Sequence, residues 1–185
     1  MSEKEKMLLG ELYDADNDEE LYELRLIAKE LCAKYNSLMP GDIENRKSVL
    51  EKIFKRKLDK CWIEPCFFCD YGFNIEFGEN FYANHNLVIL DANKVKFGNN
   101  VFIGPNCGFY TSGHPLDFKT RNKPLEYAKP IEIGDNVWIG GNVCVLPGVR
   151  IGSGSVIGAG SVVTKDIPEN ALAFGNPCKV KKFIK

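Results

Sequence analysis

The side chain best suited to chemistry in this sequence is His114, one of two histidines in the 185 residues. Imidazole is the usual general base near neutral pH. His114 lies in the segment T-S-G-H-P, where the preceding Gly113 and the following Pro115 would fix its direction. A lone histidine more often has a structural role, so the position of His114 in the fold must decide whether it is catalytic. We expect the other histidine, His85 in Y-A-N-H-N-L, to bind or pack rather than to act as the base.

The elements that must position His114 follow a repeat of six residues. Branched apolar residues recur at this interval, several are followed directly by Gly, and a small residue comes four positions after most of them. The series is Ile133, Ile139, Val145, Ile151, Ile157 and Val163, with an earlier block at Phe97, Ile103 and Phe109. A period of six fits neither a helix of ~3.6 residues per turn nor an alternating strand.

Such a period is typical of a chain wound around a triangular prism, with one hexapeptide on each face and three faces in each coil. The branched residue would point inward. Gly or Asn at the corners would accept backbone angles that are closed to bulkier residues. An ordinary β-sandwich with chance spacing is the alternative, but it does not explain six successive matches.

The repeat stops after Tyr110 and resumes at Ile131, and His114 lies at the base of the intervening segment, residues 111–129. A long excursion from a rigid scaffold is usually functional or disordered. The prolines and aromatic residues of this segment predict an ordered arm, which favours a catalytic His114. Because a prism has flat faces and the arm is long enough to reach a neighbour, we also expect a trimer.

The first sixty residues have a different pattern, which divides the chain into an N-terminal helical segment, 1–60, and the repeat region, 61–185. Asp18 would cap a helix over residues 19–36, whose apolar side chains recur three or four apart. A Met-Pro-Gly break follows, and a second helix is expected at roughly 43–57.

The net charge of −1 lacks the electrostatic footprint of a nucleic-acid-binding protein. The acidic N-terminus is unlike a signal peptide, and no apolar run approaches the ~20 residues that cross a bilayer, so we expect a cytoplasmic protein with no membrane partner. The seven cysteines are scattered. The pair Cys66 and Cys69 lacks the two further ligands of a zinc site, so reduced thiols and no metal are expected.

Several longer motifs carry a family resemblance. They are T-S-G-H-P, I-E-I-G-D-N-V-W-I-G-G, G-A-G-S-V-V-T-K-D-I-P-E-N-A-L-A-F-G-N-P, M-L-L-G-E-L-Y-D and E-P-C-F-F-C-D-Y-G-F-N-I. Together they span nearly the whole chain and resemble the hexapeptide-repeat acetyltransferases, in particular the maltose and galactoside O-acetyltransferases. The resemblance implies an all-β dominated fold, a left-handed parallel β-helix, and a homotrimer with its active sites between subunits. It also implies an enzyme that uses acetyl-CoA and needs no metal.

The implied reaction is a direct transfer of acetyl to a sugar hydroxyl, with no covalent acyl-enzyme. By likeness, His114 takes the proton of the attacking hydroxyl, and nearby donors stabilise the oxyanion. The implied acceptor contacts are Asp70, Tyr82, Asn84, Asp91 and Glu126. An acidic residue near the start, Asp14 or Asp16, would join them, and the spacing leaves the choice open. Solvated loop residues with no role are the alternative for this set.

The resemblance also implies a set of donor contacts, which are Trp138, Gly141, Ala159, Thr164, Lys165, Lys179 and Lys182. The backbone N–H of Gly141 would meet the acetyl thioester, and small residues would let the pantetheine arm lie against the coils. The lysines would pair with phosphates as mobile charges. The family often has Arg at the last two positions, so we expect a weaker phosphate contact here.

Two departures from the galactoside-type pattern concern the acceptor. Ala92 stands where those members have a second Asp, and Asp70 stands where they have Ser, which favours a maltose- or glucose-like sugar. Another acceptor, such as a galactoside, an amino-sugar or an antibiotic, stays open, as does a non-catalytic hexapeptide scaffold. The γ-type carbonic anhydrases share the prism but need three histidines around zinc, and this chain has two.

Overall fold

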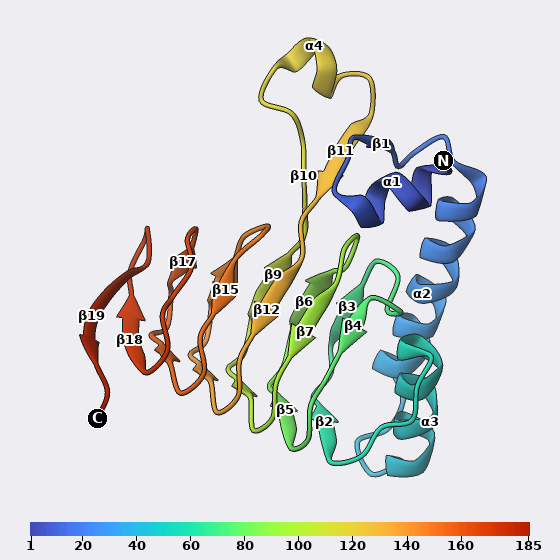
Figure 1. Ribbon diagram of the computed structural model, residues 1–185. Coiled ribbons are helices and arrows are strands. Elements are labelled where there is room, and N and C mark those ends of the chain that lie inside the picture. The colour runs from blue at the N-terminus through green and yellow to red at the C-terminus, as the bar shows by residue number, and fades with distance from the viewer.

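The computed structural model describes residues 1–185 and shows helices packed on one end of a stack of coils (Figure 1). The helices are α1 (Glu3–Leu9), α2 (Glu19–Ser37) and α3 (Ile43–Phe54). The coils begin at β2 (Cys61–Ile63), and the chain ends in β19 (Lys179–Phe183). None of the helices combines the length and apolar character needed to cross a bilayer.

The coils form a left-handed β-helix with three faces, each a sheet of parallel strands contributed by successive coils. The first face contains β2, β5 (Phe81–Ala83), β8 (Phe102–Ile103), β13 (Trp138–Ile139), β16 (Val156–Ile157) and β18 (Ala171–Phe174). The second face contains β3 (Phe67–Cys69), β6 (Leu87–Leu90), β9 (Gly108–Tyr110), β14 (Cys144–Val145) and β17 (Val162–Val163). The third face contains β4 (Ile75–Glu76), β7 (Val95–Phe97), β12 (Ile131–Ile133) and β15 (Arg150–Ile151).

The six-residue series points inward as expected, and all its members are buried, from Ile133 to Val163. The coils nearer the N-terminal helices are filled by aromatic rings instead. The ring centroid of Phe97 lies 5.0 Å from that of Phe81 and 5.0 Å from that of Phe109. Each such side chain contributes about 1.5–3 kcal/mol when it is fully buried. The repeat is therefore the core of the protein.

The corners use Asn and Gly for different reasons. Asn136 and Asn142 adopt the left-handed conformation, with φ of 56° and 57°, which Asn tolerates better than most residues. Gly134 has ordinary angles but no room, because a Cβ there would lie 2.5 Å from the Ser153 Oγ of the next coil. Gly thus lets successive coils stack closely, while Asn turns the chain.

Helices α2 and α3 cover the open end of the prism and share its core, through residues such as Cys32 and Ile53. Asp18 caps α2 as expected, since its side chain accepts from the Leu21 N–H at 2.8 Å. Helix α3 ends at Phe54 rather than near residue 57, because Lys55 takes a left-handed φ of 52°.

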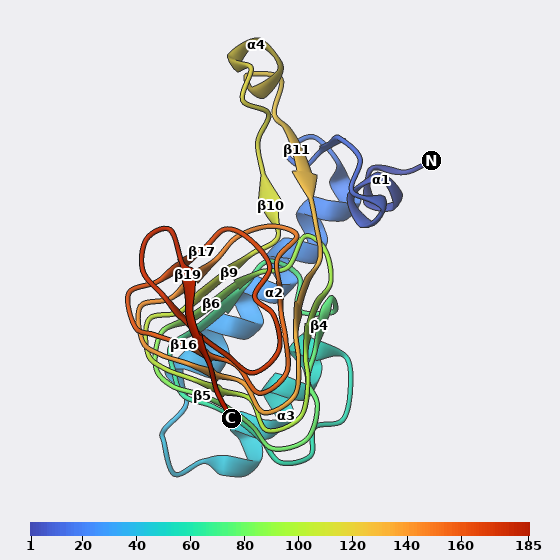
Figure 2. The same ribbon diagram turned by 60° about the vertical axis from the view of Figure 1, so that its left-hand side comes forward.

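The segment 111–129 is an ordered arm with strands β10 (Ser112–Gly113) and β11 (Leu125–Ala128) and a short helix, α4 (Phe118–Arg121). Figure 2 shows it rising away from the coils. A strand from the N-terminus, β1 (Tyr13–Asp14), pairs antiparallel with β11, so the arm becomes a sheet of order β1-β11-β10. Neither α1 nor β1 was expected from the sequence pattern.

Candidate active site

His114 follows β10 at the base of the arm, and its side chain is 54% exposed. Its Nδ1 lies 3.4 Å from the Leu125 carbonyl oxygen. A carbonyl oxygen only accepts, so in a neutral ring this pairing favours the tautomer with the proton on Nδ1 and the free electron pair on Nε2. The arm therefore presents an imidazole whose outward nitrogen is ready to accept a proton.

Glu126 lies beside that nitrogen, with its Oε1 3.8 Å from His114 Nε2. Its other oxygen, Oε2, accepts from the Tyr13 hydroxyl at 2.9 Å. At 3.8 Å the carboxylate is an ionic neighbour of the imidazole and not a direct hydrogen-bond partner. A proton arriving on Nε2 would create a positive charge next to this negative one, which stabilises the protonated ring.

Asp70 follows β3 at the same edge of the prism. Burial, and then the nearby Glu126 carboxylate, raise the pKa of Asp70 to about 6. Lys29 and Arg25 act in the opposite direction. Asp70 therefore shares the electrostatic environment of Glu126, and the two carboxylates belong to one cluster.

Asp91 follows β6, one coil further along this edge, and is fully buried. Its carboxylate accepts the backbone N–H groups of Asp70 at 3.1 Å and Tyr71 at 2.8 Å, and that of Asn74 at 3.3 Å. Burial raises the pKa of Asp91 to about 8 despite these donors. In this chain Asp91 thus holds the loop that carries Asp70.

The two acidic candidates near the start differ in what they contact. The Asp14 carboxylate accepts from the Asn17 side chain and from the backbone N–H groups of Asp16 and Asn17, so it closes a turn. The Asp16 side chain has no hydrogen-bond partner and lines an open groove with Tyr22, Arg25, Leu26 and Lys29. The geometry favours Asp16 as the residue that meets a ligand.

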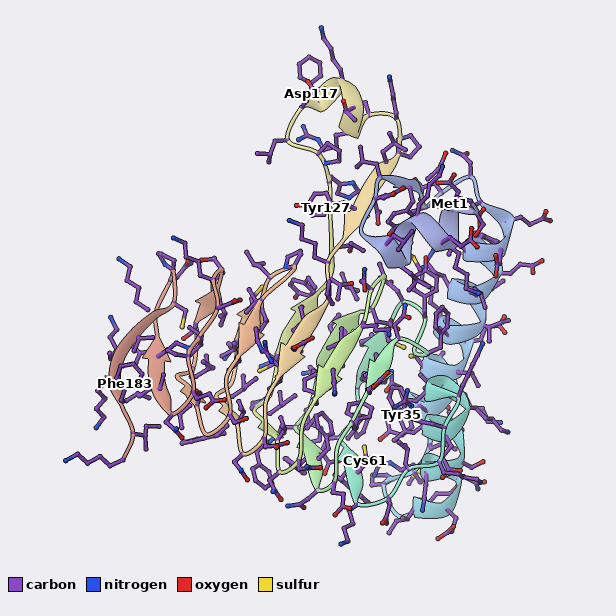
Figure 3. All side chains as sticks on the ribbon, viewed as in Figure 1. Met1, Tyr35, Cys61, Asp117, Tyr127 and Phe183 are labelled. Atoms are coloured by element: carbon purple, nitrogen blue, oxygen red, sulfur yellow. The ribbon has the colours of Figure 1, made fainter.

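Tyr82 and Asn84 lie elsewhere on the same chain. Tyr82 is on β5 of the first face, and Asn84 is in the corner between the first and second faces, whereas the arm leaves at the corner between the second and third faces. In Figure 3, Tyr127 lies on the arm, away from Cys61 at the start of the first face. One chain therefore does not bring Tyr82 and Asn84 to His114.

The donor candidates divide in the same way. Gly141 and Ala159 occupy the corner of Asn84, while Thr164 and Lys165 follow β17 at the corner of the arm. Trp138 is exposed on the first face. The Gly141 N–H has no hydrogen-bond acceptor in the chain, so it is free to bind a ligand.

The remaining two donor candidates are Lys179 and Lys182 on β19. This strand runs antiparallel to β18 at the end of the first face, with Lys179 opposite Phe174 and Lys182 opposite Leu172. Both lysines are exposed. No group of three His, Cys, Asp or Glu side chains is arranged to hold a metal ion.

Sequence reasoning identified His114 and Glu126 but missed Tyr13 and the Leu125 carbonyl. Their contacts depend on antiparallel pairing between residues far apart in the chain, which leaves no periodic signal. The one available signal was the motif M-L-L-G-E-L-Y-D, which contains Tyr13.

Comparison with known proteins gives two family matches. Residues 6–57 match the maltose acetyltransferase hexapeptide capping motif, and residues 130–165 match the bacterial transferase hexapeptide repeats. The capping motif covers α2 and α3, the two helices that close the end of the prism.

Relatives that match nearly the whole chain support the same family assignment. A putative acetyltransferase of Saccharomyces cerevisiae is 55% identical over 97% of this chain and 92% of its own length. The structure of a maltose O-acetyltransferase from Clostridium difficile 630 is 48% identical, with a TM-score of 0.97 over 100% of this chain and 98% of that one. A galactoside acetyltransferase in complex with coenzyme A is 44% identical, with a TM-score of 0.95 over 100% of this chain and 92% of that one. The chain therefore belongs to the hexapeptide-repeat acetyltransferases, in the family of the maltose and galactoside O-acetyltransferases.

Proposed function

We propose that this enzyme transfers acetyl from acetyl-CoA to a hydroxyl of a maltose- or glucose-like sugar, with His114 as the general base. The observation that carries the proposal is the pairing of His114 Nδ1 with the Leu125 carbonyl oxygen at 3.4 Å. In a neutral ring this pairing favours an unprotonated Nε2, which lies 3.8 Å from Glu126 Oε1. The donor is proposed because the similar galactoside acetyltransferase was solved with coenzyme A and a Vibrio cholerae relative with acetyl coenzyme A.

The proposed reaction is a direct displacement. The acceptor hydroxyl gives its proton to His114 Nε2 while its oxygen attacks the thioester carbonyl carbon. The tetrahedral oxyanion is stabilised by hydrogen-bond donors, of which the free Gly141 N–H is one candidate. The C–S bond then breaks, the imidazolium returns the proton to the leaving sulfur, and the products are the acetyl ester and the free thiol.

We propose a homotrimer as the active form, with each site built by two subunits. This accounts for the separation of Tyr82 and Asn84 from His114 on opposite edges of one chain. Neighbouring prisms in a three-fold arrangement would set one edge of each against the other edge of the next. Light scattering tests the assembly, and a monomer that is fully active would contradict it.

The shared site has a sharper test in mixed assemblies. His114→Ala and Asn84→Ala each disable the site when alone. Co-refolding the two variants creates some interfaces that hold both intact residues, so part of the activity returns. Mixing without any recovery would place both residues on one chain's site.

The proposed acceptor contacts are Asp16, Asp70, Glu126, Tyr82 and Asn84, since carboxylates and amides suit the several hydroxyls of a sugar. Asp91 is buried, so we assign it the support of Asp70 instead. Asp70 in place of Ser, and the buried Ala92 in place of Asp, support a maltose-like rather than a thiogalactoside-like pocket.

The decisive experiment is an acceptor screen with purified enzyme, acetyl-CoA and a thiol-release readout. We expect release with maltose and glucosides to exceed release with galactosides, amino-sugars and chloramphenicol. A preference for one of the latter groups would replace the sugar in this proposal. No release with any acceptor would contradict the proposed reaction as a whole.

A further inference from the structure

The N-terminal strand reaches the catalytic arm through one side chain. In the pairing of β1 with β11, Tyr13 stands directly opposite Glu126. Opposed residues of an antiparallel pair lie on the same side of the sheet. The buried Tyr13 hydroxyl accordingly donates to Glu126 Oε2 at 2.9 Å. One carboxylate thus lies between a hydroxyl from the N-terminus and the imidazole of His114.

The two oxygens of Glu126 have separate partners. Oε2 is occupied by Tyr13, while Oε1 is 3.8 Å from His114 Nε2. Glu126 is part-exposed on an arm that projects from the coils, so its carboxylate would otherwise be free to rotate toward solvent. A bond to one oxygen fixes the direction of the other. The Tyr13 hydroxyl therefore sets where the negative charge stands relative to the base.

The Tyr13 hydroxyl is suited to this task because it remains a donor. Burial raises the pKa of Tyr13 well above its ordinary value, and the negative charge of Glu126 raises it further. The phenol therefore stays protonated over the whole range in which an enzyme of this kind would work.

The position of Tyr13 is itself fixed from two sides. Its ring is buried among Met7, Leu21 and Tyr71 in a small apolar cluster. The buried Asn93 amide donates to the carbonyl oxygens of Met7 at 3.2 Å and Ala128 at 3.1 Å, which ties the end of α1 to the end of β11. The hydroxyl is thus held in place before any ligand arrives.

We propose that Tyr13 is a positioning residue for acetyl transfer, which acts by holding the Glu126 carboxylate against His114. The N-terminal strand is then part of the active centre and not only a cover for the coils. This inference rests on the proposed function of His114 and Glu126.

The test is Tyr13→Phe, which removes the hydroxyl and keeps the buried ring. We expect kcat to fall about tenfold, equivalent to ~1.4 kcal/mol, because one charged hydrogen bond of this size is lost. KM for acetyl-CoA and the urea midpoint of unfolding stay near those of the wild type. Tyr35→Phe is the matched control, since it also removes a buried, hydrogen-bonded hydroxyl, which donates to the Ile63 carbonyl oxygen away from the arm, and it should leave kcat unchanged.

A double-mutant cycle with Glu126→Ala separates positioning from packing. If Tyr13 acts through Glu126, then Tyr13→Phe costs about tenfold in the wild type and nothing more in the Glu126→Ala background. Equal losses in both backgrounds would overturn the inference, as would an unchanged kcat in Tyr13→Phe alone. Since Glu126→Ala leaves Tyr13 and its cluster intact, the cycle does not depend on one fragile variant.

The outcomes also distinguish this inference from the proposed function. An active wild type with an unaffected Tyr13→Phe variant overturns the role of Tyr13 alone. A wild type that releases no thiol with any acceptor overturns the proposed function, and the role of Tyr13 with it.

Discussion

The coils and the arm are held by different kinds of contact. In the coils each strand pairs with its counterparts on the same face, as Trp138 does with Phe102 below and Val156 above. In the arm, single contacts join distant segments, such as the bond between Tyr13 and Glu126 across 113 residues. The coils bury the main apolar core of the protein, whereas the arm depends on a few polar contacts that position side chains. Stability therefore depends mainly on the coils and catalysis mainly on the arm. Mutations in the coils should lower the free energy of unfolding, and mutations in the arm should lower the rate of acetyl transfer.

The largest loss of stability is expected in the coils. Phe109 is fully buried and packs edge-on against Phe97. Phe109→Ala should lower the free energy of unfolding by about 3–5 kcal/mol, because it removes a fully buried ring and leaves a cavity in the core. Urea unfolding measures this change. Phe118→Ala on the arm, where the ring is 57% exposed, should change it by less than ~0.5 kcal/mol. Similar losses in both variants would refute the contrast.

The largest loss of activity is expected in the arm. His114→Ala should lower the rate of acetyl transfer at least ~10²-fold, since a general base contributes 10²–10⁴. The side chain is half exposed, so the urea midpoint should not move. His85→Ala removes the other imidazole and should retain most of the activity. Near-normal turnover in His114→Ala would remove His114 from the mechanism.

A smaller and pH-dependent effect is expected at Asp70, where burial raises the pKa to about 6. The folded state therefore binds a proton more tightly than the unfolded state, and this group favours folding less as the pH rises from about 4 to about 6. Asp70→Asn should match the wild type near pH 4 and be more stable by about 1–3 kcal/mol above pH 6.

Unfolding measured at several pH values tests the effect of Asp70→Asn. Asp59→Asn is the control, because Asp59 is exposed and has no hydrogen-bond partner through its side chain. A constant difference between Asp70→Asn and the wild type at all pH values would contradict the titration of Asp70.

The smallest effect is expected at the end of the coils. Lys182→Ala should raise KM for acetyl-CoA about threefold to tenfold, as expected for one lost contact between an exposed lysine and a phosphate. The change should shrink in high salt. It should vanish with acetyl-pantetheine, which lacks the nucleotide. A similar rise in KM with acetyl-pantetheine would mean that Lys182 does not meet a phosphate.

The coils were predictable because each inward position repeats the chemistry of the one before it. The series from Ile133 to Val163 fixed the faces, and Asp18 fixed the start of α2. The end of α3 was placed three residues late, because the left-handed turn at Lys55 has no sequence signal as clear as Gly. Local rules thus sufficed wherever local contacts decide the structure.

The candidate site was only partly predictable, because many of its contacts are not local in the sequence. The break in the repeat located His114, and the family resemblance supplied Glu126 and Asp70. The partners that hold them, Tyr13 and Asn93, act across long sequence separations that no period or motif reveals. The edge on which each residue lies also required the order of the faces, which separates Asn84 from His114.

The antiparallel strand β19 has a consequence for solubility. A stack of parallel coils has no natural end, and an open strand edge invites another chain to continue it. At the end of the first face β19 reverses direction and covers β18, and it carries Lys179, Lys181 and Lys182 outward. The strand therefore stops the stack and repels a second copy at the same place. Because α2 and α3 cover the other end of the prism, shortening the chain before Lys179 should let two copies pair through their exposed β18 edges.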